Sequence, residues 1–181
     1  MTKISKKVLL LLVAVSMVAT LALTACGGGS QAKDTTEDTT ESAAQTLEGD
    51  VTGEIGKEYQ SKWFTFSVDA LTKTDSIPEL SAGEGNSLVV ATVTITNTSG
   101  SEQLFGTFDW LVDDDSLAEY IYPVDPLNDK MMPAEFALKD GETATYDVVV
   151  EFPADLANPF FMYIEADENG QTYSTFKIPI K

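Results

Sequence analysis

The stretch Leu88-Val89-Val90-Ala91-Thr92-Val93-Thr94-Ile95-Thr96-Asn97 decides the fold of this chain, because most of its side chains are β-branched. Such side chains fit the pleated surface of a sheet better than the crowded surface of a helix. The polar run Thr98-Ser99-Gly100-Ser101 follows directly and supplies turn-forming residues. The sequence therefore predicts a long central β-strand that ends at a turn.

Apolar and polar residues alternate on both sides of this strand, which is the pattern of half-buried strands. The apolar positions before it are Phe64, Phe66, Val68 and Ala70, and those after it are Ala144, Tyr146, Val148, Val150 and Phe152. Pro153 closes the second set, since proline cannot donate to a following ladder. Further strands are predicted at 54–59, 107–112, 119–122, 160–166 and 172–180, the last two as a hairpin turning at Asn169-Gly170. Outside the N-terminal segment no helical period is sustained. The predicted fold is all-β: a two-sheet antiparallel β-sandwich of the immunoglobulin-like type.

The N-terminus predicts export. Lys3, Lys6 and Lys7 precede an apolar run over 8–23, which is shorter than the roughly 20 residues that span a bilayer. Leu23-Thr24-Ala25-Cys26 looks like the lipobox of bacterial lipoproteins. We therefore expect a signal peptide at 1–25 and a diacylglyceryl anchor on Cys26, which would hold the protein on the extracellular face of the cell membrane. The alternative is a plain signal peptide followed by an incidental free cysteine.

The remaining chain divides into two parts. Residues 26–50 are rich in Gly, Thr, Ser and acids, with Leu47 as the only large apolar side chain, and predict a disordered linker. Residues 51–181 contain all the predicted strands and form one domain that is large enough to bury a core without a crosslink.

Composition excludes most catalytic apparatus. The chain has no histidine, one cysteine and no arginine, and its net charge is −18. These numbers exclude a disulfide framework, a thiolate zinc site and His-based nucleophile systems. The negative charge should repel nucleic acid and anionic lipid headgroups. We expect no enzymatic activity, no cofactor and no nucleic-acid partner.

One candidate metal site is the acidic cluster at Asp113-Asp114-Asp115, with Glu119, Asp125 and Asp129 nearby in sequence. Carboxylate oxygens suit Ca²⁺, but an EF-hand needs glycine at its sixth position, where Ala118 stands here. The interpretation that we favour is a charged turn without a metal. The sequon Asn97-Thr98-Ser99 is likewise predicted to form a turn rather than to carry a glycan.

A candidate partner-binding loop lies at 120–133, where Tyr120, Tyr122, Met131 and Met132 gather with three prolines. Tyrosine and methionine side chains can form an adaptable binding surface. The alternative, which we favour, is that the loop folds back as a lid on the core. Trp63 and Trp110 are both predicted to pack in the core or at its end.

A resemblance covers roughly residues 53–181. It is carried by Gly56-Lys57-x-Tyr59-x-x-x-Trp63-Phe64-x-Phe66-x-Val68, by Gly83-Glu84-Gly85-Asn86-x-Leu88-Val89-Val90 through Val93-Thr94-Ile95-x-Asn97, by Leu138-x-x-Gly141-Glu142 and by Glu151-Phe152-Pro153. These motifs resemble the telokin-like, immunoglobulin-like domain of unknown function found in lipoproteins of Gram-positive bacteria. That family is similar in architecture to a secreted mycobacterial antigen, and the resemblance implies a fold and a location without an established active site.

The function predicted from the sequence is display of a non-catalytic domain at the cell surface, where it binds a protein or envelope-polymer partner or stabilises an envelope assembly. One alternative is a carboxylate-based cell-wall hydrolase. Another is a small solute-binding lipoprotein, although the predicted strands lack the alternating helices of the usual two-lobed binder.

Overall fold

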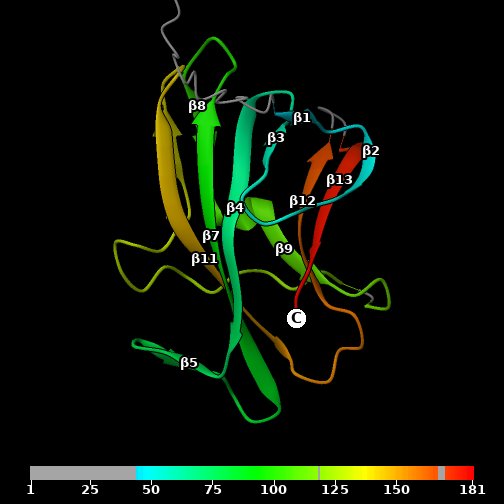
Figure 1. Ribbon diagram of the computed structural model, residues 1–181. Coiled ribbons are helices and arrows are strands. Elements are labelled where there is room, and N and C mark those ends of the chain that lie inside the picture. The colour runs from blue at the N-terminus through cyan, green and yellow to red at the C-terminus, as the bar shows by residue number, and fades with distance from the viewer. Residues whose placement is uncertain (1–43, 118, 167–169) are drawn as a thin grey trace, which may run out of the picture. The chain divides into compact units, whose positions relative to one another are not determined.

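The computed structural model describes residues 44–117, 119–166 and 170–181, and within them the fold is all-β (Figure 1). The larger sheet has the order β1 (Gln45–Thr46), β3 (Glu58–Gln60), β4 (Phe64–Thr74), β7 (Asn86–Asn97) and β11 (Thr143–Pro153). The smaller sheet has the order β2 (Gly49–Thr52), β13 (Thr172–Pro179), β12 (Phe160–Ala166) and β9 (Trp110–Asp113). The two sheets pack face to face, which confirms the predicted β-sandwich.

Several short elements lie outside the two main sheets. Two more pairs of strands are β5 (Ser76–Ile77) with β6 (Leu80–Ser81), and β8 (Gln103–Phe105) with β10 (Phe136–Leu138). A single 3₁₀ turn, η1, covers Thr107–Asp109. The described part of the chain holds no helix with the length and apolar character that crossing a bilayer would require.

The predicted central strand is β7, which pairs antiparallel with β4 on one side and with β11 on the other. Ile95 lies opposite Phe66 in β4 and opposite Ala144 in β11. The alternate residues of β7 from Val89 to Asn97 are buried, since this face of the strand points into the sandwich. The hairpin of β12 and β13 also agrees with the prediction from the sequence.

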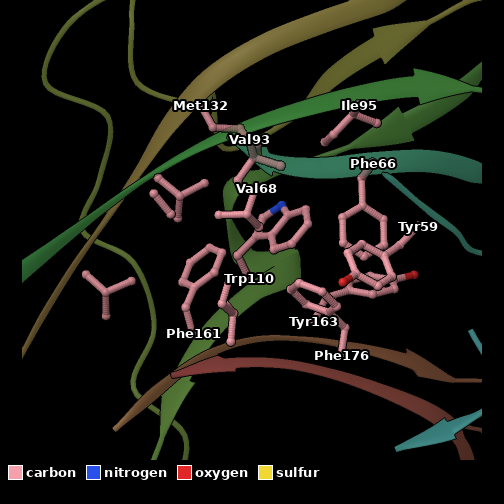
Figure 2. Close-up of a cluster of buried hydrophobic side chains, with 14 of the residues drawn as sticks. Tyr59, Phe66, Val68, Val93, Ile95, Trp110, Met132, Phe161, Tyr163 and Phe176 are labelled. Carbon is pink, nitrogen blue, oxygen red and sulfur yellow. The ribbon is translucent and has the colours of Figure 1, made fainter. Parts of the chain in front are cut away.

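Side chains from both sheets meet in an aromatic core (Figure 2). The ring of Phe66 in β4 lies 5.0 Å from that of Phe176 in β13 and 5.3 Å from that of Trp110 in β9, between ring centroids, both at edge-to-face angles. Trp110 stacks on Phe161 with 5.4 Å between centroids. These are the preferred geometries of aromatic pairs, and they tie the two sheets together. The prediction that Trp110 packs in the core is confirmed, since it is 1% exposed.

One core position predicted for the strand at 64–70 is wrong. Ala70 is exposed, because the register of β4 against β7 shifts between Val68 and Ala70. A β-bulge adds one residue to one strand, so every later side chain of that strand points to the opposite face of the sheet from the one that the alternation predicts. Leu71 consequently takes over the inward direction and packs against the core.

The expected linker ends earlier than predicted. Within the residues expected to be disordered, β1 and the start of β2 form strands instead, each pairing in parallel with its neighbour: β1 with β3 of the larger sheet, β2 with β13 of the smaller. Leu47 lies between them and is 5% exposed. Its N–H donates to Gln60 O (2.9 Å) and its carbonyl accepts from Ser174 Oγ (3.3 Å). One buried leucine and backbone pairing at two sheet edges are enough to order this segment, and both edge pairings depart from the purely antiparallel arrangement that we expected.

Three of the predicted strands also differ in extent. The strand expected at 54–59 contains a turn at Ile55–Gly56 and begins only at Glu58, and the one expected at 107–112 opens with the 3₁₀ turn. The strand expected at 119–122 is reduced to a single antiparallel bridge between Ile121 and Val112. Short segments rely on their neighbours for pairing, so the sequence pattern alone does not fix their limits.

Candidate binding surface

The connection between Tyr120 and Pro133 runs from the edge of one sheet to the edge of the other. Ile121 and Val112 of β9 exchange two backbone hydrogen bonds of 2.9 Å. Farther along, Val124 N–H donates to Val149 O (2.9 Å) and Met132 N–H to Asp147 O (2.8 Å), both on β11. Both β9 and β11 are edge strands. The connection therefore covers two edges that would otherwise present unpaired backbone groups.

The methionines of this connection belong to the core. Met132 is 1% exposed and is part of the main cluster between the sheets (Figure 2). Met131 is 4% exposed and packs with Leu88 and Val149 in a second cluster. The connection ends against η1, where Thr107 N–H donates to Pro133 O (3.0 Å). For this half of the connection, the structure has the geometry of a lid.

The tyrosines of the same connection face solvent. Tyr120 is 45% exposed and Tyr122 is 56% exposed. Together with Asp113, Leu117 and Glu119 they line a cavity of about 450 Å³, which we call the tyrosine–acid pocket. The structure thus joins part of the predicted binding loop to part of the predicted acidic cluster. The other acids of that cluster, Asp114, Asp115, Asp125 and Asp129, do not line this pocket.

The three consecutive aspartates have three different environments. Asp113 is 8% exposed, and its Oδ1 accepts the Asp114 N–H (2.8 Å). Asp114 Oδ1 accepts from Ser116 Oγ (2.6 Å) and from Ser116 N–H (2.9 Å), and these bonds hold the pKa of the Asp114 carboxyl below its usual value. Asp115 has a left-handed backbone (φ 62°) and pairs with Lys177 Nζ at 2.7 Å. The aspartates build a turn, and within the described residues no three acids lie close enough together to hold a metal ion.

Trp63 is not buried in the core, so the core position that the sequence analysis allowed for it is excluded. It is 41% exposed and lines a smaller cavity of about 240 Å³ with Leu104 and Asp109, among others. The Lys62 Nζ lies 4.5 Å from the centroid of its ring. Trp63 precedes β4 in a tight turn whose N–H groups are accepted by Ser61 Oγ. In a turn the alternation of the following strand no longer sets the direction of the side chain.

Asn97 of the predicted sequon has a clear position. Asn97 is fully buried at the end of β7, and its Nδ2 donates to Ser101 O and Leu138 O, both at 2.7 Å. Its Oδ1 accepts the Ser99 N–H (2.9 Å), so the sequon anchors a turn as predicted. Cys26, the predicted lipid-attachment residue, lies outside the described residues.

Comparison of the sequence with protein-family models and with curated proteins finds no match. Comparison of the structure with solved structures does find similar folds. A candidate lipoprotein of Bacillus subtilis, ycdA, superposes with a TM-score of 0.53 at 13% identity, over 67% of this chain and 38% of that one. The secreted protein MPT63 of Mycobacterium tuberculosis gives 0.52 at 10% identity, over 70% and 96%. A protein of unknown function from Listeria monocytogenes gives 0.51 at 13% identity, over 75% and 90%.

At these identities the likeness concerns the fold alone. The described domain shares its β-sandwich with a candidate lipoprotein and with a secreted mycobacterial protein. The immunoglobulin-like and telokin-like type of the sandwich stays a prediction from the sequence motifs.

Proposed function

We propose that this protein is anchored to the outer face of the bacterial cell membrane by a diacylglyceryl group on Cys26 and displays a non-catalytic β-sandwich that binds a partner. The export signal and the Leu-Thr-Ala-Cys motif support the anchor. The description of one structural neighbour as a candidate lipoprotein and of another as a secreted protein agrees with that location.

The tyrosine–acid pocket carries the binding part of the proposal. Tyrosine combines a large apolar ring with a hydroxyl, and for this reason it is enriched at protein interfaces. Tyr120 and Tyr122 are both about half exposed, although the methionines of the same connection are buried. The backbone on which the tyrosines stand is held to β9 by the bridge at Ile121, so the two rings project from a fixed support. Such a preorganised pair loses little conformational entropy when a partner binds.

The anchor is tested with Cys26→Ala. We expect the variant to appear in the medium or to remain unprocessed, because no thiol is then available for the lipid. A Cys26→Ala protein that is cleaved at the same bond and still fractionates with the membrane would exclude the lipid anchor.

The binding function is tested by crosslinking the anchored protein in its native envelope and identifying the attached molecules by mass spectrometry. We expect one dominant partner with the wild-type protein and its loss with the double variant Tyr120→Ala/Tyr122→Ala. Leu127→Ala is the matched control, because Leu127 is 47% exposed on the same connection but lies outside the pocket. If the double variant is still crosslinked to the partner, or if the control also loses the crosslink, the partner does not bind at the tyrosine–acid pocket.

A further inference from the structure

We propose that the tyrosine–acid pocket recognises an organic ammonium group. This inference rests on the proposed binding function and names the chemistry of the ligand. It draws on three independent observations: the charge of the pocket lining, the environment of Asp113, and the contrast between the pocket tyrosines and the exposed ring of Trp63.

The charged residues that line the pocket are both acids, Asp113 and Glu119, and no lysine lines it within the described part of the chain. The salt bridge between Asp115 and Lys177, which lies close to Asp113 in sequence, does not change the negative charge of the lining. Lys177 binds Asp115 at 2.7 Å, and its Nζ also lies 4.3 Å from the centroid of the Phe160 ring. The ammonium of Lys177 is therefore already engaged outside the pocket, and the lining retains its negative charge.

Asp113 is the more buried of the two acids in the lining, with an exposed fraction of 8%. Its Oδ1 accepts a hydrogen bond from Asp114 N–H. An ionised carboxylate has about four acceptor positions. A carboxylate that lines a cavity therefore favours a ligand that donates hydrogen bonds or carries positive charge.

The exposed ring of Trp63 shows what such a ring attracts in this protein. Trp63 has Lys62 Nζ over its ring at 4.5 Å, so its cation is supplied by the same chain. The described structure contains three more contacts of this kind, on the rings of Tyr59, Phe152 and Phe160. Tyr120 and Tyr122 have no such lysine among the described residues, although they are as exposed as Trp63.

These features together select for an ammonium group. Aromatic faces attract cations through the ring quadrupole, and nearby carboxylates add charge attraction and acceptors for N–H donors. A simple inorganic cation would use only the carboxylates, and two monodentate acids form a poor site for Ca²⁺, which takes six to eight oxygen ligands. The ligand is either a free small amine or a lysine side chain presented by another protein.

The test is a titration of the full chain in detergent micelles with tetramethylammonium chloride, followed by NMR of ¹³C-labelled tyrosine rings. Sodium chloride at the same ionic strength is the reference for screening. We expect the signals of Tyr120 and Tyr122, identified by their loss in the variants, to shift saturably with tetramethylammonium and not with sodium. Equal shifts with both salts would overturn the proposal, because they would show screening only.

Variants locate the site. Tyr120→Leu and Tyr122→Leu keep an apolar side chain but remove the aromatic face, and each should weaken binding about two- to fivefold. Glu119→Gln should weaken it as well. Glu84→Gln is the matched control, because it removes the same charge from an exposed turn that does not line the pocket. If Glu84→Gln weakens binding as much as Glu119→Gln does, the effect is that of overall charge and the assignment fails.

Two probes separate the sources of the ammonium group. Cadaverine represents a free amine, and a lysine-containing peptide blocked at both ends represents a protein side chain; tighter binding of one identifies the source. The ammonium inference and the proposed function fail separately. Envelope crosslinks that depend on the tyrosines, together with no response to any of these amines, would overturn the ammonium inference and leave the binding function standing.

Discussion

The first half of the connection from Tyr120 to Pro133 exposes its two tyrosines, whereas the second half buries its two methionines. Met131 and Met132 are at most 4% exposed, whereas Tyr120 and Tyr122 are at least 45% exposed. The tyrosines flank the bridge between Ile121 and Val112 of β9, and the methionines enter the space beside β11. Each half has an exception, because Pro123 is buried and Leu127 is 47% exposed, so the contacts of each position decide its burial.

The largest effect is expected in the buried half. Met132→Ala should destabilise the domain by about 2 to 5 kcal/mol, because it leaves a cavity between the sheets. Urea unfolding followed by fluorescence measures this change. A cost below about 0.5 kcal/mol, equal to that of the exposed control Leu127→Ala, would show that the connection is not a part of the core.

The next effect concerns the other segment that passes between the sheets, at 45–52. Leu47→Ala should cost about 2 kcal/mol, near the lower end for a buried leucine, since Leu47 lies at a sheet edge. The exposed strand residue Gln45→Ala is the control. Equal unfolding midpoints for the two variants would restore the prediction that residues up to 50 contribute nothing to the fold.

The exposed half should matter little for stability. Tyr120→Ala and Tyr122→Ala are each expected to change the free energy of unfolding by no more than about 0.5 kcal/mol, as is usual for surface substitutions. Combined in one protein, the two substitutions should abolish crosslinking to the envelope partner. If either one unfolds the domain, the tyrosines are part of the structure and the contrast between the two halves disappears.

The smallest effect is a pH dependence in the acidic turn beside the tyrosines. The hydrogen bonds from Ser116 lower the pKa of Asp114 in the folded state below its ordinary value of 3.8. The folded state therefore favours the ionised carboxylate, and this stabilisation is present above about pH 3.8 and is lost as pH falls through the lower, folded-state pKa.

Urea midpoints measured against pH test this assignment. Ser116→Ala removes the 2.6 Å hydrogen bond and should be less stable than the wild type at neutral pH, with the difference shrinking once Asp114 is protonated. Ser81→Ala, an exposed serine in β6, serves as the control. A difference between wild type and Ser116→Ala that stays constant down to the lowest pH would exclude the carboxylate as its origin.

Much of the fold could be predicted from the sequence because long strands carry their own signal. The β-branched run over 88–97, the alternation over 144–152 and the hairpin predicted for 160–166 and 172–180 placed four of the main strands and indicated the all-β class. The burial of Trp110 followed from its position in an apolar run. The bulge in β4 could not be predicted, because the pattern of one strand does not show where its partner skips a residue.

The candidate site could be predicted only in part. The aromatic and acidic residues were identified as two separate candidates, and no periodicity indicated that Asp113 and Glu119 would share a cavity with Tyr120 and Tyr122. Trp63 was predicted to pack in the core or at its end, and the turn at Ser61 leaves it 41% exposed. The most useful signal in the sequence was the length of the connection, since long loops in compact domains often carry function.

By itself, the sequence of this protein determines the all-β class and the absence of histidine and arginine chemistry, and it predicts an export signal, because each of these follows from composition or from local periodicity. The tertiary structure decided which aromatic rings are buried, how residues 45–52 pair with both sheets, and which acids share a cavity with the tyrosines. These depend on contacts between residues far apart in the chain, such as Leu47 with Ser174 and Asp115 with Lys177. Local propensity cannot specify such contacts, because they form only when both sheets have taken their places.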